Sequence, residues 1–376
     1  MLNQLIEQIR QLPPVSQPAA NEYGEKQPLL VEQVNRKMKK HPELATLIGR
    51  NPLQVMYDNH ESHAVFMSNV FQLGLYETLL RVIQWVYRSY SSRGFSFDYF
   101  PAALQAWKGA VADHLQEERA REVITVYDWL LQQHSRFIEL SREGISWDTG
   151  EESPGWQKSR LAFLHSLLQG NSQECLDRAR ASVQNREQVK DFYLQVIQPA
   201  MYEIGVGWEK GEVSVAQEHL ASAIISRVMS ALYQAHVLVE ETKWSKAVVT
   251  SAPNEFHEVG GYMVADFLEM EGWDVYYLGA NTPVEDLRDI LLDKRPFLLA
   301  VSVTMPFNLS GVKTIIETVQ AEPELKGVKI MAGGMAFNGE PDLWKRIGAD
   351  GWAANARDAV ELAQKWYAEE NGRNVE

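Results

Sequence analysis

Two short stretches of this chain carry residue types that suit a metal-containing ligand. In the first stretch, Glu255, Phe256 and His257 are followed three residues later by Gly260. A histidine that binds a metal through one ring nitrogen needs its other nitrogen fixed by a carboxylate or carbonyl, and Glu255 is suitably placed for this. Gly260 would let a bulky group lie close to the backbone. We therefore expect His257 to be a metal ligand that Glu255 orients.

The second stretch lies about forty residues earlier and contains an indole and a carboxylate–imidazole pair. Trp208 is followed, after nine residues, by Glu218 and His219. Trp208 by itself is typical of a hydrophobic core. In combination with the histidine loop, however, these residues indicate a site in which the two stretches face each other across a large flat group.

The elements that carry these stretches differ in class. Apolar residues recur at three and four spacing through residues 28–143 and 157–242, which predicts a helical N-terminal domain and a four-helix bundle. Within 243–376, strands alternate with helix-length segments, as in a Rossmann-like doubly wound parallel sheet. Residues 1–27, with several prolines and small polar residues, are predicted to be a loosely attached leader, and residues 144–156 a linker.

The predicted strands end in residues that suit a ligand. The strand runs are 247–250, 275–278, 298–303 and 328–332. Ligands of parallel sheets bind beyond the carboxyl ends of the strands. Besides the His257 loop, we expect this edge to contain Leu278, Gly279, Asn281, Ser302, Thr304, Gly333 and Gly334. The glycine pair alone would indicate only a turn. No glycine-rich dinucleotide fingerprint follows the first strand, which disfavours a nicotinamide cofactor.

The order and spacing of these residues resemble the cobalamin-binding Rossmann-like domain. The resemblance spans residues 245–376 and rests on Glu255-x-His257-x-x-Gly260, Ser302-Val303-Thr304 and Gly333-Gly334. It implies that His257 replaces the cofactor's own benzimidazole as the lower ligand of cobalt. The nucleotide tail would then thread a slot lined by Ser302, Thr304 and the two glycines. Many members have aspartate at the position of Glu255, and the glutamate resembles the light-sensing branch.

Trp208 with Glu218 and His219 resembles the helical cap of the CarH and LitR photoreceptors. The resemblance implies that these side chains pack around the adenosyl group of adenosylcobalamin, on the upper face of cobalt. It also implies that light breaks the cobalt–carbon bond, that the adenosyl group leaves and that the bundle shifts. The histidine that captures cobalt after illumination in that family is replaced by Glu209. His219, water or hydroxide would have to fill that position.

The N-terminal domain departs from those photoreceptors, which have a basic helix-turn-helix there. It instead resembles the photocobilins, in which a helical region holds biliverdin beside the cobalamin. The residues expected to contact the bilin are His60, His63, Tyr87, Tyr90, Arg93 and Tyr99. Because the single cysteine, Cys175, lies outside this region, attachment would be noncovalent. The same aromatic residues are also typical of a core, and the two histidines would suit a metal, a haem or an exposed helix face.

Composition limits the possible functions. The 376 residues carry a formal charge of −14, which argues against direct binding of nucleic acid. One cysteine cannot form an intrachain disulfide, and no apolar run reaches the length that crosses a bilayer. These features predict a cytoplasmic protein with no membrane association.

We therefore expect a light sensor, rather than an enzyme, that binds adenosylcobalamin and biliverdin. It would signal through a change of homo-oligomer, such as a dimer, or through a separate partner. A corrinoid methyl carrier serving methyltransferases would share His257 and the bundle. A redox or gas sensor whose N-terminal domain binds haem is the third alternative.

Overall fold

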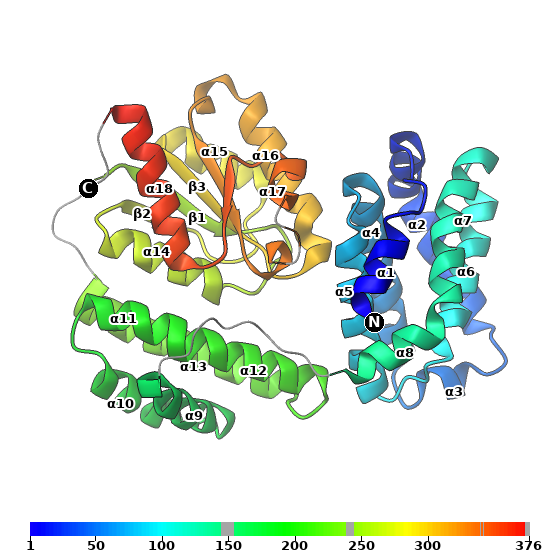
Figure 1. Ribbon diagram of the computed structural model, residues 1–376, viewed down its shortest axis with the longest axis horizontal. Helices are drawn as coiled ribbons and strands as arrows, with labels where there is room; N and C mark the ends of the chain where they lie inside the picture. Colours follow the sequence, from blue (N-terminus) through cyan, green and yellow to red (C-terminus); the bar gives the residue numbers. More distant parts are fainter. Residues whose placement is uncertain (144–153, 238–243, 339, 341, 373–376) are drawn as a thin grey trace. The chain divides into compact units, whose positions relative to one another are not determined.

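The computed structural model describes residues 1–143, 154–237, 244–338, 340 and 342–372. Its contacts divide the chain into two compact units. The N-terminal unit comprises residues 1–146 and 209–212, and the C-terminal unit residues 147–208 and 213–376. The described elements of the N-terminal unit are helices, whereas the C-terminal unit combines a helical bundle with a parallel sheet (Figure 1). The predicted fold class is confirmed.

The N-terminal unit is built around α2, which packs against α4 and α6, with α6 in turn packing against α7. Its described helices are α1 (Leu2–Ile9), α2 (Gln17–Lys39), α3 (Leu44–Ile48), α4 (Leu53–Leu73), α5 (Tyr76–Ser92), α6 (Tyr99–His114), α7 (Glu117–Gln132) and α8 (His134–Arg142). α4 ends where Gly74 adopts a left-handed conformation with φ +66°. This conformation costs glycine little and allows the abrupt turn into α5.

The first 27 residues are part of this unit, so the prediction of a loosely attached leader is wrong. Leu5 and Ile9 of α1 and Tyr23 of α2 have no exposed surface. The Tyr23 hydroxyl also lies 2.9 Å from the hydroxyl of Tyr127 on α7. α2 continues through Pro28, where the sequence predicted a boundary. Proline and small polar residues therefore concealed two amphipathic helices whose apolar faces are buried.

The bundle of the C-terminal unit has the four helical segments that the sequence predicts. They are α9 (Pro154–Leu168), α10 (Ser172–Ser182), a continuous segment made of α11 (Arg186–Phe192), the π-helical turn η1 (Tyr193–Ile197) and α12 (Gln198–Glu209), and α13 (Val215–Leu232) with the π-helical turn η2 (Tyr233–Val237). Pro199 lacks a backbone N–H, which accounts for the change of hydrogen-bond register just before it. Ser214 and Gln217 form a capping box that starts α13. The predicted linker falls largely on residues 144–153, outside the described residues.

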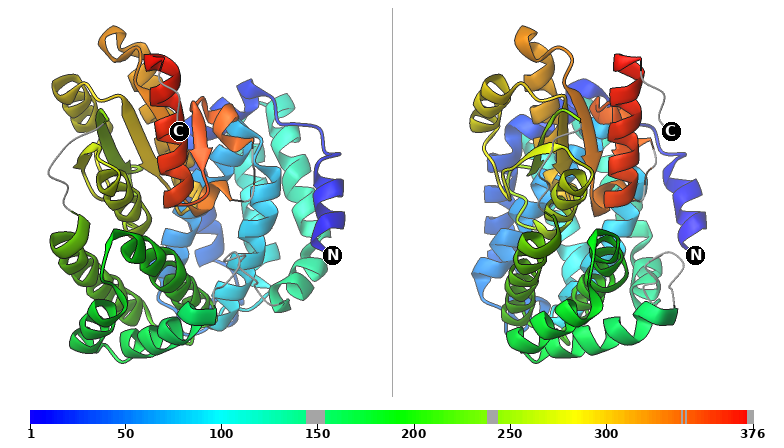
Figure 2. Two further views of the ribbon diagram at one scale, coloured as in Figure 1. Left: turned by 60° about the vertical axis from the view of Figure 1, so that its left-hand side comes forward. Right: turned by 90° about the vertical axis from the view of Figure 1, so that its left-hand side faces the viewer.

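The sheet has five parallel strands in the order β2-β1-β3-β4-β5. The strands are β1 (Lys246–Ser251), β2 (Asp274–Tyr277), β3 (Leu298–Ser302), β4 (Lys329–Gly333) and β5 (Gly351–Ala353). The connections contain α14 (Val259–Met270), α15 (Val284–Lys294), η3 (Pro306–Asn308), α16 (Leu309–Ala321), η4 (Pro323–Leu325), η5 (Met335–Phe337) and α17 (Leu343–Ile347), and α18 (Ala356–Asn371) follows β5. α14 and α18 cover one face of the sheet, and α15, α16 and α17 cover the other (Figures 1 and 2).

Four strands lie where the sequence places them. β1, β3 and β4 are largely buried, as continuous apolar runs predict, whereas β2 is a half-buried edge strand. The fifth strand, of three residues, was not predicted. It is too short to produce a pattern of its own. The strand order reverses direction between β1 and β3. The helices that follow these two strands, α14 and α16, cover opposite faces of the sheet. Such a switch point is where doubly wound sheets bind ligands.

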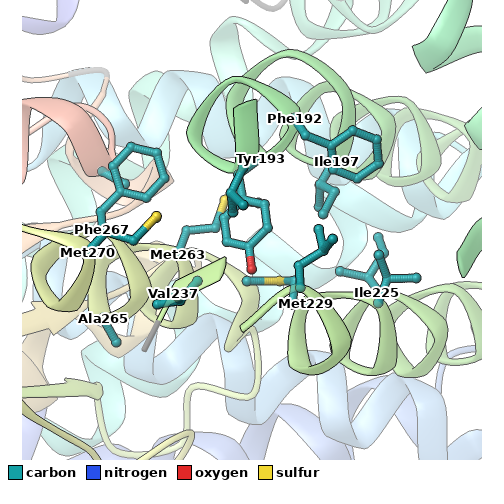
Figure 3. Packing of buried hydrophobic residues seen from close by; sticks show 14 of the residues in the cluster. Phe192, Tyr193, Ile197, Ile225, Met229, Val237, Met263, Ala265, Phe267 and Met270 are labelled. Carbon is teal, nitrogen blue, oxygen red and sulfur yellow. The ribbon is translucent and has the colours of Figure 1, made fainter. Parts of the chain in front are cut away.

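Bundle and sheet share one hydrophobic core in the C-terminal unit. Its central residues come from η1, α13, η2 and α14, and Figure 3 shows how Tyr193, Met229, Val237 and Met263 pack there. This shared core fixes the bundle against α14, the helix that begins after the His257 loop. None of the described helices is both long and apolar enough to cross a membrane.

Candidate functional site

The loop after β1 places an imidazole and a carboxylate in direct contact. His257 Nδ1 lies 2.5 Å from Glu255 Oε1. The Glu255 side chain is buried, whereas 52% of the His257 side chain is exposed. An ionised carboxylate only accepts hydrogen bonds, so Nδ1 carries a proton, and in the neutral ring Nε2 is the nitrogen that keeps its lone pair. The ring thus presents to solvent the nitrogen that could bind a metal.

Glu255 is itself held by the loop after β3. Its Oε2 accepts the backbone N–H groups of Thr304 and Met305, each at 2.9 Å, and the side-chain N–H of Asn308 at 3.2 Å. Its Oε1 also accepts the backbone N–H of His257 at 3.1 Å. Hydrogen bonds to an ionised acceptor are stronger than neutral ones. Met305 and Asn308 were not predicted, because nothing in the local sequence connects them to a residue about fifty positions earlier.

These donors decide the charge of the pair. Burial alone would raise the pKa of Glu255, but hydrogen bonds from His257 and from the backbone of Met305 outweigh it and lower the pKa to about 2. The hydrogen bond to Glu255 raises the pKa of His257, although burial acts in the opposite direction. Glu255 is therefore ionised at neutral pH and keeps the Nδ1 proton of His257 in place.

The loops after β1 and β2 interlock beside this pair. The Asn254 backbone N–H donates to Asn281 Oδ1 at 2.8 Å, and the Asn281 N–H donates to the Glu255 carbonyl at 3.1 Å. Both asparagines have positive φ, of 61° and 54°, a conformation that asparagine tolerates better than most residues. The Tyr277 hydroxyl donates to the Glu258 carbonyl at 3.1 Å. Asn281 thus stabilises the loop after β1 through two hydrogen bonds.

Gly260 and Gly261, at the start of α14, lie close to Ser302, Tyr277 and Ser251. A Cβ added to Gly261 would lie 3.6 Å from Ser302 Cβ, 3.6 Å from the Tyr277 ring and 3.9 Å from Ser251 Oγ, and one added to Gly260 would lie 3.6 Å from Ser302 Oγ. Ser251 Oγ is buried and has no hydrogen-bond partner within the described part of the chain. A buried hydroxyl without a partner is costly. The sequence analysis did not predict this hydroxyl.

The glycine pair after β4 packs against neighbouring backbone. A Cβ at Gly334 would lie 2.3 Å from the Val303 carbonyl oxygen, and φ there is +96°. A Cβ at Gly333 would lie 3.4 Å from the Ala353 carbonyl oxygen. The pair thus forms a tight turn that also brings the loops after β3 and β4 together. Gly279 has a positive φ of 77°, and the N–H of Leu278 extends the pairing of β2 with β1 by donating to Val249 at 2.9 Å.

The bundle presents the second predicted group of residues. Trp208, near the end of α12, is half-buried, and Glu218 and His219 lie in the first turns of α13. Glu218 accepts from Ser222 at 2.9 Å, and His219 is 73% exposed with Nε2 3.5 Å from Glu218. The Glu218 charge contributes to the raised pKa of His257. The bundle carboxylate and the sheet imidazole are therefore within electrostatic reach of each other.

Exposed apolar side chains flank both polar groups. Phe256, beside His257, is 72% exposed, and Val215, one turn before Glu218, is 50% exposed. Both side chains therefore lie beside residues that the sequence predicts to contact the ligand. Glu209 is not part of this surface: it belongs to the N-terminal unit, is buried, and accepts from Arg88 Nε at 2.6 Å.

The N-terminal histidines lie in a network of buried aromatic residues. His60 Nε2 lies 3.0 Å from the Tyr99 hydroxyl and its Nδ1 2.5 Å from Asn35 Oδ1. His63 Nε2 lies 3.1 Å from the Tyr127 hydroxyl. Burial lowers the pKa of His60 to about 4 and that of His63 to about 3. Both rings are neutral at physiological pH, and the alternative of an exposed helix face is excluded for His60.

Tyr87, Tyr90 and Arg93 continue this aromatic cluster. Tyr87 stacks on Phe100 with centroids 3.8 Å apart and lies 2.9 Å from His134 Nδ1 through its hydroxyl. Tyr90 contacts Tyr99 at a centroid distance of 6.1 Å. Arg93 donates to the Ser89 carbonyl at 2.8 Å. The six residues predicted to hold a bilin are thus neighbours, but the polar contacts described above are to other protein groups, as in an aromatic core.

The possible metal ligands of the C-terminal unit suit a metal ion that a macrocyclic cofactor already coordinates. No cluster of three or more His, Cys, Asp or Glu side chains that could hold a free metal ion occurs in the described ranges. His257 offers a single exposed nitrogen, with a carboxylate behind it. Zinc and similar ions need three or four protein ligands, whereas a macrocyclic metal needs one axial ligand.

Comparison with known protein families gives one match on the helical bundle and one on the sheet domain of the C-terminal unit. Residues 161–233 and residues 245–361 each match a family model described as a B12 binding domain. Over 211 residues the chain is 28% identical to the HTH-type transcriptional repressor CarH of Myxococcus xanthus, covering 56% of this chain and 67% of CarH. Over 193 residues it is 25% identical to dimethylamine corrinoid protein 3 of Methanosarcina acetivorans, covering 51% of this chain and 87% of that protein.

One solved structure that is similar to part of this chain is the monomethylamine corrinoid protein of Methanosarcina barkeri. It has a TM-score of 0.49 and 21% sequence identity, and the comparison covers 56% of this chain and 98% of that chain. The two family matches fall on the bundle and on the sheet of the C-terminal unit.

Proposed function

Because this chain carries B12-binding domains and belongs to the cobalamin-binding proteins, we propose that it is a light sensor that binds adenosylcobalamin. In this proposal His257 is the lower ligand of cobalt, and Trp208, Glu218 and His219 lie beside the adenosyl group. The sensor is not an enzyme and signals through a change of oligomer or through a separate partner.

The lower side of the proposed site is supported by the Glu255–His257 pair. Glu255 holds the proton on Nδ1 and leaves Nε2 free and exposed. The donors from the β3 loop keep the carboxylate ionised. In this proposal the nucleotide tail passes beside Gly260 and Gly261, where a larger side chain would obstruct it, close to the buried hydroxyl of Ser251. These residues therefore fit cobalamin without a further metal ligand from the protein.

The observation that carries the light-sensing proposal is the group of residues on the bundle. Adenosylcobalamin supplies a cobalt–carbon bond that light can cleave. The half-buried Trp208 offers a flat apolar surface for a large upper group, and Glu218 offers a carboxylate that can accept from hydroxyl or amino groups. A methyl group would need neither. The similarity to CarH supports the same assignment.

The test is an absorption spectrum of the protein loaded with adenosylcobalamin, recorded before and after green light. We expect bleaching of the adenosyl form, and weaker retention of adenosylcobalamin in Trp208→Ala. Trp156→Ala is the matched control, because Trp156 is a half-buried tryptophan of the same bundle that packs against Phe192. A spectrum that light leaves unchanged, or equal effects of the two substitutions, would refute the proposal.

A corrinoid methyl carrier is the second candidate, since the chain resembles dimethylamine corrinoid proteins at nearly the same identity as CarH. A carrier should bind methylcobalamin at least as tightly as adenosylcobalamin. It should also be indifferent to truncation of Trp208. The two titrations on the wild-type protein and on Trp208→Ala therefore separate the candidates.

The proposal extends to noncovalent biliverdin in the N-terminal unit. Its support is the contiguous cluster of His60, His63, Tyr90 and Tyr99, whose neutral imidazoles could accept from pyrrole N–H groups if the internal hydrogen bonds rearrange. Added biliverdin should give a long-wavelength band that His63→Leu weakens, with His165→Leu in the bundle as control. A Soret band after addition of haem would instead favour the redox or gas sensor. The absence of both bands would favour a plain aromatic core.

A further inference from the structure

The bundle and the sheet are joined by polar contacts on one helix, α14. The Tyr193 hydroxyl donates to Asp266 Oδ2 and the Tyr233 hydroxyl to Glu269 Oε1, each at 2.7 Å. Lys190 on α11 forms an ion pair with Glu271, just after α14. Tyr193 and Asp266 are buried within the shared core, where Figure 3 shows Tyr193. These contacts fasten the bundle along the C-terminal half of α14.

Both tyrosines begin a π-helical turn. Tyr193 is the first residue of η1, and Tyr233 is the first residue of η2. π-helical turns are rare and are frequently found at functional sites. Each turn in this bundle is therefore attached to α14 at the residue where its register changes.

Three of the residues in these contacts, Tyr233, Asp266 and Glu269, also line a cavity. The cavity, of about 330 Å³, is lined by Tyr233, Tyr262, Ala265, Asp266, Glu269, Val275 and Tyr277. Tyr262 stacks on Tyr277 with centroids 5.2 Å apart, and Tyr277 donates to the Glu258 carbonyl, next to His257. α14 thus carries the histidine loop at its beginning and the two tyrosine contacts near its end.

We infer that the bonds of Tyr193 to Asp266 and of Tyr233 to Glu269 form a proton-sensitive latch, which sets how firmly the bundle is held on α14 and thereby how tightly cobalamin is retained. Tyr193, Tyr233 and Asp266 act as positioning residues in this latch. The inference depends on cobalamin binding but not on light sensing.

Protonation of Asp266 determines the direction of the pH effect. Burial raises the pKa of Asp266 to about 7, against the hydrogen bond from Tyr193, and Glu269 adds to the rise. When the latch opens and water reaches the carboxyl group, its pKa returns toward 3.8. Between these two values the closed state holds one proton more than the open state. The closed state is therefore favoured at low pH. The equilibrium constant between the closed and the open state falls about tenfold per pH unit as the pH rises from 3.8 to 7, and it levels off above pH 7.

The charges near Asp266 come from few elements. Glu269 and Tyr262 lie on its own helix, Tyr193 on η1, Tyr233 on η2 and Tyr277 on β2. Lys190 is neutralised by Glu187 and Glu271. α18 and β1 add buried apolar residues to the same core, among them Ala359, Val360, Ala363, Ala247 and Val249. Burial raises the pKa of Glu269 as well, in the same direction as that of Asp266, whose pKa is raised to about 7.

Hydrogen exchange of the cobalamin-free protein tests the latch without light or cofactor. Protection of peptides from 186–197, measured relative to a β3 peptide at the same pH, should fall about 15-fold between pH 5.5 and 7. Asp266→Asn, which imitates the protonated acid, should abolish this dependence, and Tyr193→Phe should lower protection throughout. Tyr202→Phe removes a half-buried hydroxyl that contacts Gln198 within the bundle, so it should behave as wild type.

Wild-type protection that is independent of pH would overturn the latch, and so would equal behaviour of Tyr193→Phe and Tyr202→Phe. If Asp266→Asn does not fold, the wild-type pH series and the two tyrosine variants still decide. The release rate of hydroxocobalamin should rise over the same pH range. Release that does not follow the exchange data would refute the link to the cofactor, whereas a failure of light sensing would leave these results unaffected.

Discussion

Replacing Glu255 by glutamine should reverse the protonation of His257. Glu255 Oε1 now accepts both the backbone N–H and the Nδ1–H of His257. In Glu255→Gln the amide oxygen is expected to take the place of Oε2, because three donors from the β3 loop surround that position. The amide NH₂ then faces His257, whose Nδ1 must accept. The proton moves to Nε2, the nitrogen proposed to bind cobalt.

The size of the effect follows from the contacts that are lost. A hydrogen bond to a charged group contributes about 1.5 to 3 kcal/mol. The backbone N–H of His257 also loses its acceptor, and a buried donor without a partner costs about 1 to 3 kcal/mol. Part of this cost is already present in the free protein. We therefore expect a cobalamin affinity about 10- to 100-fold lower, in the range of other changes to groups that orient metal-bound histidines.

Calorimetric titration with cobalamin measures the affinity, and the absorption spectrum shows whether histidine or the cofactor's own benzimidazole binds cobalt. Glu255→Gln should give the benzimidazole-bound form, as should His257→Ala. Glu255→Asp is the matched control, because it keeps a charged acceptor and should retain the histidine-bound spectrum. If Glu255→Gln binds cobalamin through histidine with an affinity within twofold of wild type, the account of the tautomer is wrong.

Three further predictions concern stability and the tail slot. Ser251→Ala should leave the free energy of unfolding unchanged or higher, since it removes a buried hydroxyl without a partner, and should weaken cobalamin binding measured by titration; unchanged binding would place the tail elsewhere. Gly334→Ala should lower the free energy of unfolding, measured in urea, by more than about 2 kcal/mol because the added Cβ meets the Val303 carbonyl oxygen. Gly327→Ala is the control: its φ is also positive but no atom lies nearby, so it should lower the free energy of unfolding by about 1 kcal/mol. Equal losses would contradict the tight turn. The pKa of His60 is lowered from 6.5 to about 4, so only the unfolded chain is protonated between these values; stability should fall by about 3 kcal/mol as pH drops from 6.5 to 4. Exchange of α4 peptides measures this loss, and a slope that persists in His60→Gln would assign it to another group.

Local patterns predicted much of the C-terminal unit. Each of β1 to β4 is a short apolar run followed by a helix, and these features depend on neighbouring residues alone. The two-residue spacing of Glu255 and His257 likewise brings their side chains together within one loop. The N-terminal boundary was less accessible, because the prolines of the first residues suggested a leader. Burial of Leu5 and Tyr23 against distant helices carried no signal in that segment.

The sequence by itself determined which residues could hold a metal-containing ligand and which class of element bears them, since both depend on residue type and short periodicity. Only the tertiary structure decided how these residues are charged and supported. Asn308 reaches Glu255 across 53 positions, and Tyr193 reaches Asp266 across 73. Such contacts arise when packing of the sheet and the bundle excludes water, so that each buried polar atom must find a partner wherever the fold supplies one.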